Sequence, residues 1–125
     1  NLRGTVHGNS IYVIVGDNGT ILTSDNGSTW TSRADGRTDN LSEVTFGNNT
    51  FIAVGDNGTI RTSSDNGTTW DNRTSGTTKF YGVTFGKNTF IAVGDNGTIR
   101  TSSDNGTTWD NRTSGTTVNL RGVGF

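Results

Sequence analysis

The 125-residue chain contains no cysteine, no proline and no methionine. The absence of cysteine excludes disulfides and thiolate metal sites and leaves the cellular compartment open. The absence of proline leaves every backbone N–H available as a hydrogen-bond donor, which suits closely paired strands. The chain has no initiator methionine and no signal peptide, as expected for a processed chain, a fragment or a deliberately built one.

Charge and hydrophobic residues are also scarce. The net charge of −1 argues against a nucleic-acid-binding protein, which usually carries a basic face. No apolar run approaches the ~20 residues of a membrane-spanning helix. Leu, Ile, Val and Phe make up 26 of the 125 residues, close to the level of disordered chains. The balanced charge, three tryptophans and six phenylalanines nevertheless favour a folded core.

Gly, Asn, Thr and Ser account for most of the chain, and an internal repeat explains the excess. Asp-Asn-Gly begins at residues 17, 56 and 95, and again at 25, 65 and 104. The blocks 44–78 and 83–117 differ only at Asn48 and Lys87, and residues 119–122 repeat residues 1–4. The chain is therefore three repeats followed by the first strand of a fourth, with predicted boundaries at 1–39, 40–78, 79–118 and 119–125.

Each repeat reads as four short strands. In the third repeat we expect strands at 83–85, 90–93 and 98–102, with a fourth beginning at 107–109. Asp-Asn-Gly supplies the positive φ angles of tight hairpin turns, and no segment has helical periodicity. Four antiparallel strands every ~40 residues predict an all-β fold built of β-propeller blades. A β-solenoid is the alternative.

The turn between the third and fourth strands carries the pattern Ser/Thr-x-Asp-x-Gly-x-Thr-Trp in every repeat. The matching residues are Thr23, Asp25, Gly27 and Trp30; Ser63, Asp65, Gly67 and Trp70; and Ser102, Asp104, Gly106 and Trp109. This pattern resembles the Asp-box, also called the bacterial neuraminidase repeat. Together with the preceding Val-Gly-Asp-Asn-Gly-Thr-Ile it is similar to repeats of photosystem II assembly-factor-like propellers. The resemblance implies a structural role, in which the Asp binds backbone amides of its own turn, the hydroxyl helps to close it and the Trp packs beneath it.

The first repeat is one residue shorter before its box. A one-residue slip would exchange the two faces of the strand 21–23. We therefore expect the missing residue to be absorbed at the preceding turn or in a bulge. Leu22 stands where the other repeats have Arg61 and Arg100, so the outward surface is also expected to differ there.

The sequence does not supply an active site. A sialidase site, which the box resemblance raises, combines three arginines, a Tyr–Glu pair and an Asp, but Glu43 is the only glutamate and the two tyrosines are not equivalent. The aspartates lie mostly in turns, which does not suit paired-carboxylate glycosidases. The only histidine, His7, aligns with Phe46, Phe85 and Phe125 and is interpreted as a substitute for an aromatic core residue. We therefore expect no catalytic residue and no cofactor. We also expect no bound metal, because a complete calcium-loop pattern is absent.

Arginines recur once per repeat after the box, at Arg33, Arg73 and Arg112. With Asp71 and Asp110 they are expected to form surface ion pairs of little net value. Alternatively, they line a repeated carbohydrate or anion site. Ten Asn-x-Ser/Thr sequons, many in tight turns, favour a bacterial host without this glycosylation. A secreted or periplasmic location is expected from the resemblance to secreted bacterial repeat proteins.

Three blades do not close a ring, because propellers have four to eight. We therefore expect head-to-tail homo-oligomers, with a six-bladed dimer favoured and a nine-bladed trimer as the alternative. The two terminal segments either compete for one innermost-strand position or act as a clasp between chains. The closure residues are expected to be Leu2, Val6, Leu120, Val123 and Phe125. The predicted role is a non-enzymatic self-assembling scaffold or interaction module with a protein or glycan ligand. The alternatives are a multivalent lectin and, second, a glycosidase-like enzyme.

Overall fold

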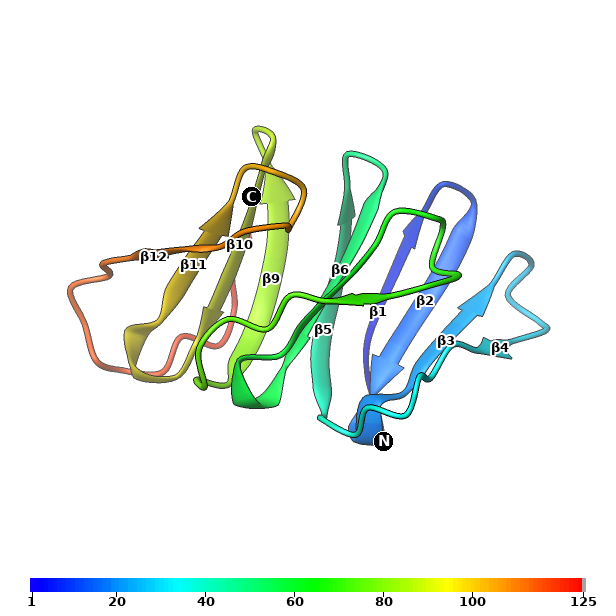
Figure 1. Ribbon diagram of the computed structural model, residues 1–125, viewed down its shortest axis with the longest axis horizontal. Coiled ribbons are helices and arrows are strands. Elements are labelled where there is room, and N and C mark those ends of the chain that lie inside the picture. The colour runs from blue at the N-terminus through cyan, green and yellow to red at the C-terminus, as the bar shows by residue number, and fades with distance from the viewer. Residues whose placement is uncertain (125) are drawn as a thin grey trace.

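The computed structural model describes residues 1–124 as three separate four-stranded antiparallel sheets, which lie side by side along the molecule (Figure 1). Phe125, which the sequence assigns to ring closure, lies outside the described residues. In each sheet the strands follow chain order. The prediction of an all-β fold made of four-stranded blades is confirmed, and the sheets are called blades 1, 2 and 3 below. No helix among residues 1–124 is long and apolar enough to cross a membrane.

The strands recur with nearly the same lengths in the three blades. Blade 1 contains β1 (Leu2–Gly8), β2 (Ile11–Gly16), β3 (Ile21–Ser24) and β4 (Thr31–Ser32). Blade 2 contains β5 (Leu41–Gly47), β6 (Thr50–Gly55), β7 (Ile60–Ser63) and β8 (Asp71–Asn72). Blade 3 contains β9 (Phe80–Gly86), β10 (Thr89–Gly94), β11 (Ile99–Ser102) and β12 (Asp110–Arg112). The first strands β1, β5 and β9 lie next to one another.

Asp-Asn-Gly forms the connection between the second and third strands of every blade. These residues make the short turns η1 (Asp17–Gly19), η2 (Asp56–Gly58) and η3 (Asp95–Gly97). In η2, Asn57 has φ 57° and Gly58 has φ 69°. Asn and Gly tolerate this left-handed conformation better than other residues, which explains why the turn sequence recurs.

The fourth strand starts later than the sequence suggested. Residues 107–109 belong to a turn, and β12 begins at Asp110. The expected start was wrong because Thr108 donates both its N–H and its hydroxyl to Asp104, at 2.9 and 2.6 Å, and so is held in the turn. β-branched residues have high strand propensity, but local side-chain hydrogen bonds compete with the ladder.

The core consists of two hydrophobic clusters, one at each junction between blades. Alternate residues of β6 point to opposite neighbours: Phe51 and Ala53 pack toward blade 1, whereas Ile52 and Val54 pack toward blade 3. All four residues are fully buried. The apolar run of β6 is therefore covered on both faces, whereas the equivalent run of β10, for which the same burial was expected, leaves Ile91 half-buried because no further blade lies beyond it within this chain. Blades 1 and 3 are each covered on one face only by this chain.

The first repeat absorbs its missing residue after β3, not before it. Ile14 lies opposite Leu22 and Val15 opposite Ile21, which matches the pairing of Ala53 with Arg61 and Val54 with Ile60. The strand therefore keeps its register and its faces. The expected bulge or altered preceding turn was wrong, because the turn that follows the strand can lose a residue without moving any buried side chain.

Candidate interaction surfaces

A hydroxyl and a carboxylate organise the outer turn of blade 2. The Ser63 hydroxyl donates to Asp65 Oδ1 at 2.8 Å and accepts the N–H of Gly67 at 2.9 Å. Asp65 also accepts the N–H and the hydroxyl of Thr69, and Trp70 Nε1 donates to the Gly67 carbonyl at 2.8 Å. Blade 3 repeats these contacts through Ser102, Asp104, Gly106 and Trp109.

The corresponding turn of blade 1 uses different residues from those expected. Ser24, and not Thr23, accepts the N–H of Gly27, at 2.8 Å. Asn26, and not Asp25, accepts the N–H groups of Ser28 and Thr29, both at 2.9 Å. The expectation for Thr23 and Asp25 was wrong because the shorter turn shifts both roles by one position. The Trp30 ring is 6.4 Å from that of Tyr12, much as the Trp70 ring is 6.3 Å from that of Phe51 in blade 2.

Hydrogen bonding stabilises the charged form of the turn carboxylates. Bonds from Thr108 first, and then from Ser102, lower the pKa of Asp104 to about 2. For Asp65, burial acts to raise the pKa, but hydrogen bonds from Thr69 and Ser63 outweigh it and lower the pKa. These carboxylates are committed to their own turns as acceptors, which does not suit a general acid.

The three recurring arginines lie one per blade, on or just after the outermost strand. Arg73 lies 3.8 Å from Asp71 and Arg112 lies 3.7 Å from Asp110, so both expected surface ion pairs are present. Arg33, whose blade has Thr31 in place of an aspartate, donates from Nε to Thr23 Oγ1 at 3.0 Å. Arg33 and Arg112 line separate cavities of about 210 and 610 Å³, so the arginines do not converge on one site.

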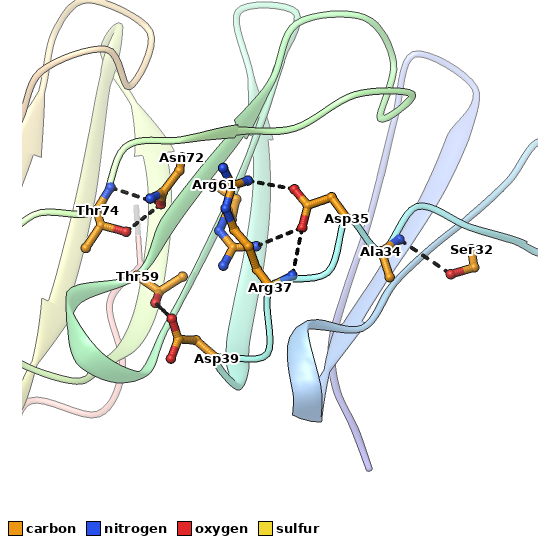
Figure 2. Close-up of polar contacts among 9 residues, drawn as sticks. All are labelled: Ser32, Ala34, Asp35, Arg37, Asp39, Thr59, Arg61, Asn72 and Thr74. Carbon is orange, nitrogen blue, oxygen red and sulfur yellow. Dashed lines mark hydrogen bonds and ion pairs between the residues drawn. The ribbon is translucent and has the colours of Figure 1, made fainter.

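A buried arginine marks the junction between blades 1 and 2, which sequence reasoning missed. Arg61 is only 1% exposed, and its Nη1 lies 3.9 Å from Asp35 Oδ1 in the loop that leaves blade 1. Figure 2 shows Asp35 in contact with both Arg61 and Arg37, and Arg37 donates to the other Asp35 oxygen at 2.6 Å. Burial, and then the Arg37 charge, lower the pKa of Arg61. Among residues 1–124, Arg61 Nε has no hydrogen-bond partner.

A second arginine, Arg100, lies at the junction between blades 2 and 3, and its Nε has no hydrogen-bond partner among residues 1–124. Arg100 packs against the loop of blade 2, where its Nη2 would lie 2.7 Å from a Cβ added at Gly76. The equivalent loop of blade 3, with the turn η3, lines the open cavity of about 610 Å³ formed by Asn96–Thr98 and Asn111–Thr117.

Amide side chains form a second bridge between neighbouring blades. Asn9, in the β1–β2 turn, donates to Asn66 in the outer turn of blade 2 at 3.1 Å. Asn48 makes the equivalent bond to Asn105 of blade 3 at 2.5 Å. In blade 3, Lys87 occupies the position of Asn9 and Asn48. Sequence reasoning missed this bridge, although the one difference between blocks 44–78 and 83–117, Asn48 against Lys87, falls on it.

The outer face of blade 1 leaves apolar residues in contact with solvent. Leu2 is 60% and Tyr12 40% exposed, whereas their equivalents Leu41 and Phe51 in blade 2 are fully buried. His7 lies opposite Tyr12 with its ring 4.5 Å away, as Phe46 lies opposite Phe51, so it does occupy the position of an aromatic residue.

Not every residue expected to close a ring lies on an open face. Val6 packs against the cluster between blades 1 and 2, so that expectation was wrong: β1 points Val6 inward and Thr5 outward. Leu120 and Val123 are half-buried on blade 3. Residues 1–124 contain no group of three His, Cys, Asp or Glu side chains that could hold a metal ion.

The comparisons with known proteins bear on the fold. No family model and no curated protein matches the chain. Among solved structures, YCF48 from Cyanidioschyzon merolae is similar at 23% identity and a TM-score of 0.74, over 88% of this chain and 36% of that chain. YCF48 bound to D1 peptide is similar at 21% identity and a TM-score of 0.74, over 88% of this chain and 39% of that chain. This chain therefore spans well under half the length of both neighbours, and it shares with them the fold of a β-propeller segment.

Proposed function

We propose that the chain is a non-enzymatic interaction module that completes its propeller by assembling head to tail with further copies. The observation that carries this proposal is the contrast between equivalent positions: Leu41 and Phe51 are fully buried by a preceding blade, whereas Leu2 and Tyr12 are exposed. An apolar face of this kind on a small protein marks an interaction site.

The opposite end of the chain offers a complementary face. Ile91 and Ile99 of blade 3 are half-buried, whereas their equivalents Ile52 and Ile60 are covered by the next blade. Blade 3 of one copy can therefore cover blade 1 of another through the same kind of junction that the chain already forms twice. Two copies give six blades, within the known range of four to eight, and three copies give nine.

Light scattering and native mass spectrometry test the assembly. We expect a mass of twice the 13.2 kDa chain at micromolar concentration. Tyr12→Asp places a charge on the exposed face and should reduce assembly strongly without unfolding the chain. Thr31→Asp is the matched control, because it adds the same charge at the exposed position where blade 2 already has Asp71. A monomeric mass for the unaltered chain would overturn the proposal.

A protein segment is the ligand that we favour for the completed module, since a solved neighbour is bound to a peptide. Arg33, Arg73 and Arg112 place one guanidinium on each blade, and an acidic segment would exchange the aspartate partners of Arg73 and Arg112 for its own carboxylates. Arrays of acidic peptides and of glycans, probed with the assembled chain, separate the two ligand classes. We expect peptide binding that weakens in the Arg73→Ala/Arg112→Ala variant. Binding to glycans alone would instead support a lectin.

A further inference from the structure

We propose that the C-terminal segment of one copy, described here as residues 119–124, replaces β1 of the next copy, so that the ring closes by strand exchange. This inference rests on the proposed head-to-tail assembly and specifies how its junction is made. A strand contributed by the partner would make the junction between copies equivalent to the junctions inside the chain.

The C-terminal segment already lies where a fourth blade would begin. The Asn119 side-chain oxygen accepts the N–H of Asn96 at 2.9 Å, and the Leu120 N–H donates to the Gly94 carbonyl at 2.9 Å. At the first junction the Asn40 side-chain oxygen accepts the N–H of Asn18 at the same distance. Asn119 therefore holds blade 3 in the way that Asn40, which precedes β5, holds blade 1.

The segment also runs along the first strand of blade 3. A Cβ added at Gly82 of β9 would lie 3.4 Å from the Gly122 Cα, just as one added at Gly4 of β1 would lie 2.9 Å from the Glu43 Cα of β5. The Arg121 guanidinium lies over the Tyr81 ring at 4.7 Å. Residues 121–123 thus take the place beside β9 that β5 takes beside β1.

Within the described residues, this segment has no strand to pair with. Residues 118–124 form no ladder, although blades 1, 2 and 3 each pair their first strand with a second strand. The backbone groups of an unpaired strand are a template for another chain. The partner that the segment lacks is the second strand of a blade. In a head-to-tail assembly, the second strand that follows in the ring is β2 of the neighbouring copy.

The sequence of the segment fits β2 because it repeats the residues that β2 already pairs with. The Asn1 carbonyl, just before β1, accepts the N–H of Asp17 at 2.9 Å. In β1, Leu2 lies opposite Gly16 and Arg3 donates to the Asp17 carboxylate. Asn119, Leu120 and Arg121 can make the same three contacts with the next copy. The two middle repeats have Ser42 and Tyr81 at the arginine position, so the arginine is confined to the two terminal segments.

The connection between blades favours the exchanged strand over the resident one. Inside the chain, the loop that leaves the fourth strand of a blade continues directly into the first strand of the next, as residues 33–40 lead into β5. With strand exchange, the chain passes in the same way from blade 3 of one copy into blade 1 of the next. If β1 stays in its own blade, no strand of one copy belongs to a sheet of the other. The exchanged strand also places Val123 where blades 2 and 3 have Val44 and Val83, although it replaces Val6 with Gly124.

Engineered cysteines distinguish the two arrangements. Thr5 lies opposite Ile14 in the β1–β2 ladder, so an exchanged strand places Val123 opposite Ile14 of the next copy. Opposite residues in an antiparallel pair are about 4.5–5.5 Å apart at Cα, which suits a disulfide. We expect the Val123→Cys/Ile14→Cys variant to form covalent multimers on non-reducing gels. The matched control, Thr5→Cys/Ile14→Cys, should cross-link within one chain only when β1 is retained.

Truncations provide a second test with light scattering as the readout. The chain lacking residues 1–7 should assemble as tightly as the full chain, whereas the chain lacking residues 119–125 should lose at least tenfold in assembly affinity. If the full chain assembles but only the Thr5→Cys/Ile14→Cys pair cross-links, or the chain ending at residue 118 assembles equally well, the strand exchange is wrong and assembly stands. If the full chain is monomeric, both proposals fail.

Discussion

In the outer turns of blades 2 and 3, Asp65 and Asp104 accept hydrogen bonds from the turn, and in blade 1 the amide oxygen of Asn26 does the same. The turn therefore needs an acceptor oxygen at this position. The turn of blade 1 forms without a negative charge there, because its acceptor is a neutral amide. What the carboxylate adds is its second oxygen, which in blade 3 accepts the Thr108 hydroxyl at 2.6 Å.

Substitution of Asp104 tests this division of roles. We expect Asp104→Ala to lower the free energy of unfolding by about 1 kcal/mol at pH 7, because N–H and hydroxyl donors of the turn lose their acceptor. Asp104→Asn should cost less, since it keeps the oxygen that Asn26 provides in blade 1. Urea unfolding followed by tryptophan fluorescence measures both, and equal destabilisation by the two variants would contradict the argument.

The same residue predicts a pH dependence. Because hydrogen bonds in the folded chain lower the pKa of Asp104 from 3.8 to about 2, its contribution to stability is complete above about pH 4 and is lost as the pH falls toward 2. We expect the difference in unfolding free energy between the unaltered chain and Asp104→Asn to shrink over this range. A difference that stays constant from pH 7 to pH 2.5 would show that ionisation of Asp104 does not stabilise the fold.

At the scale of the element, the η turns do more than reverse the chain. The Gly58 N–H donates to the Thr78 carbonyl and the Gly58 carbonyl accepts the N–H of Ser75, both at 2.9 Å, so η2 also fixes the loop that leaves blade 2. A Cβ at Gly58 would collide with the Gly76 carbonyl oxygen and lie 2.6 Å from that of Ser75. Glycine is therefore required here for space as well as for its φ of 69°.

Gly115 provides a matched comparison, because its φ is 80° but a Cβ there would meet nothing within 4 Å. We expect Gly115→Ala to cost about 1 kcal/mol for the left-handed conformation alone. Gly58→Ala should cost clearly more, because two backbone carbonyls must also move. Chemical denaturation of both variants measures the difference, and equal costs would mean that the loop shifts freely away from η2.

The elements could largely be predicted from the sequence, whereas their junctions could not. The alternation in 83–85 and the apolar run 90–93 predicted β9 and β10, because side chains in a strand alternate between faces. The burial of Arg61 could not be predicted, because it depends on the loop that leaves the preceding blade. By sequence alone, a charged residue in a strand of alternating polarity is expected to face solvent. The roles of Ser24 and Asn26 were missed for a local reason: a one-residue deletion can be placed on either side of β3 by sequence, and only strand pairing decides.

For the whole molecule, the two internal junctions define what a junction between copies must resemble. Asn9 meets Asn66 and Asn48 meets Asn105 across the internal junctions. At the open end of blade 3 the donor is Lys87, and the outer turn of blade 1 that it would meet is shorter and carries the exposed Asp25. In the proposed head-to-tail ring, the Lys87 cation of one copy and the Asp25 anion of the next would lie where the internal junctions have their amide pairs.

Charge reversal at these two positions tests whether they meet. We expect Lys87→Glu and Asp25→Lys each to raise the dissociation constant of the assembly about two- to fivefold, as for the loss of an exposed ion pair, and the double variant to restore it. The effect should weaken as salt is added, because exposed charges are screened. Thr74→Glu, an exposed position on the middle blade, controls for the change in net charge. Sedimentation velocity over a dilution series gives the constants. If the double variant assembles no better than either single variant, Lys87 and Asp25 do not face each other, and the copies are joined through other surfaces.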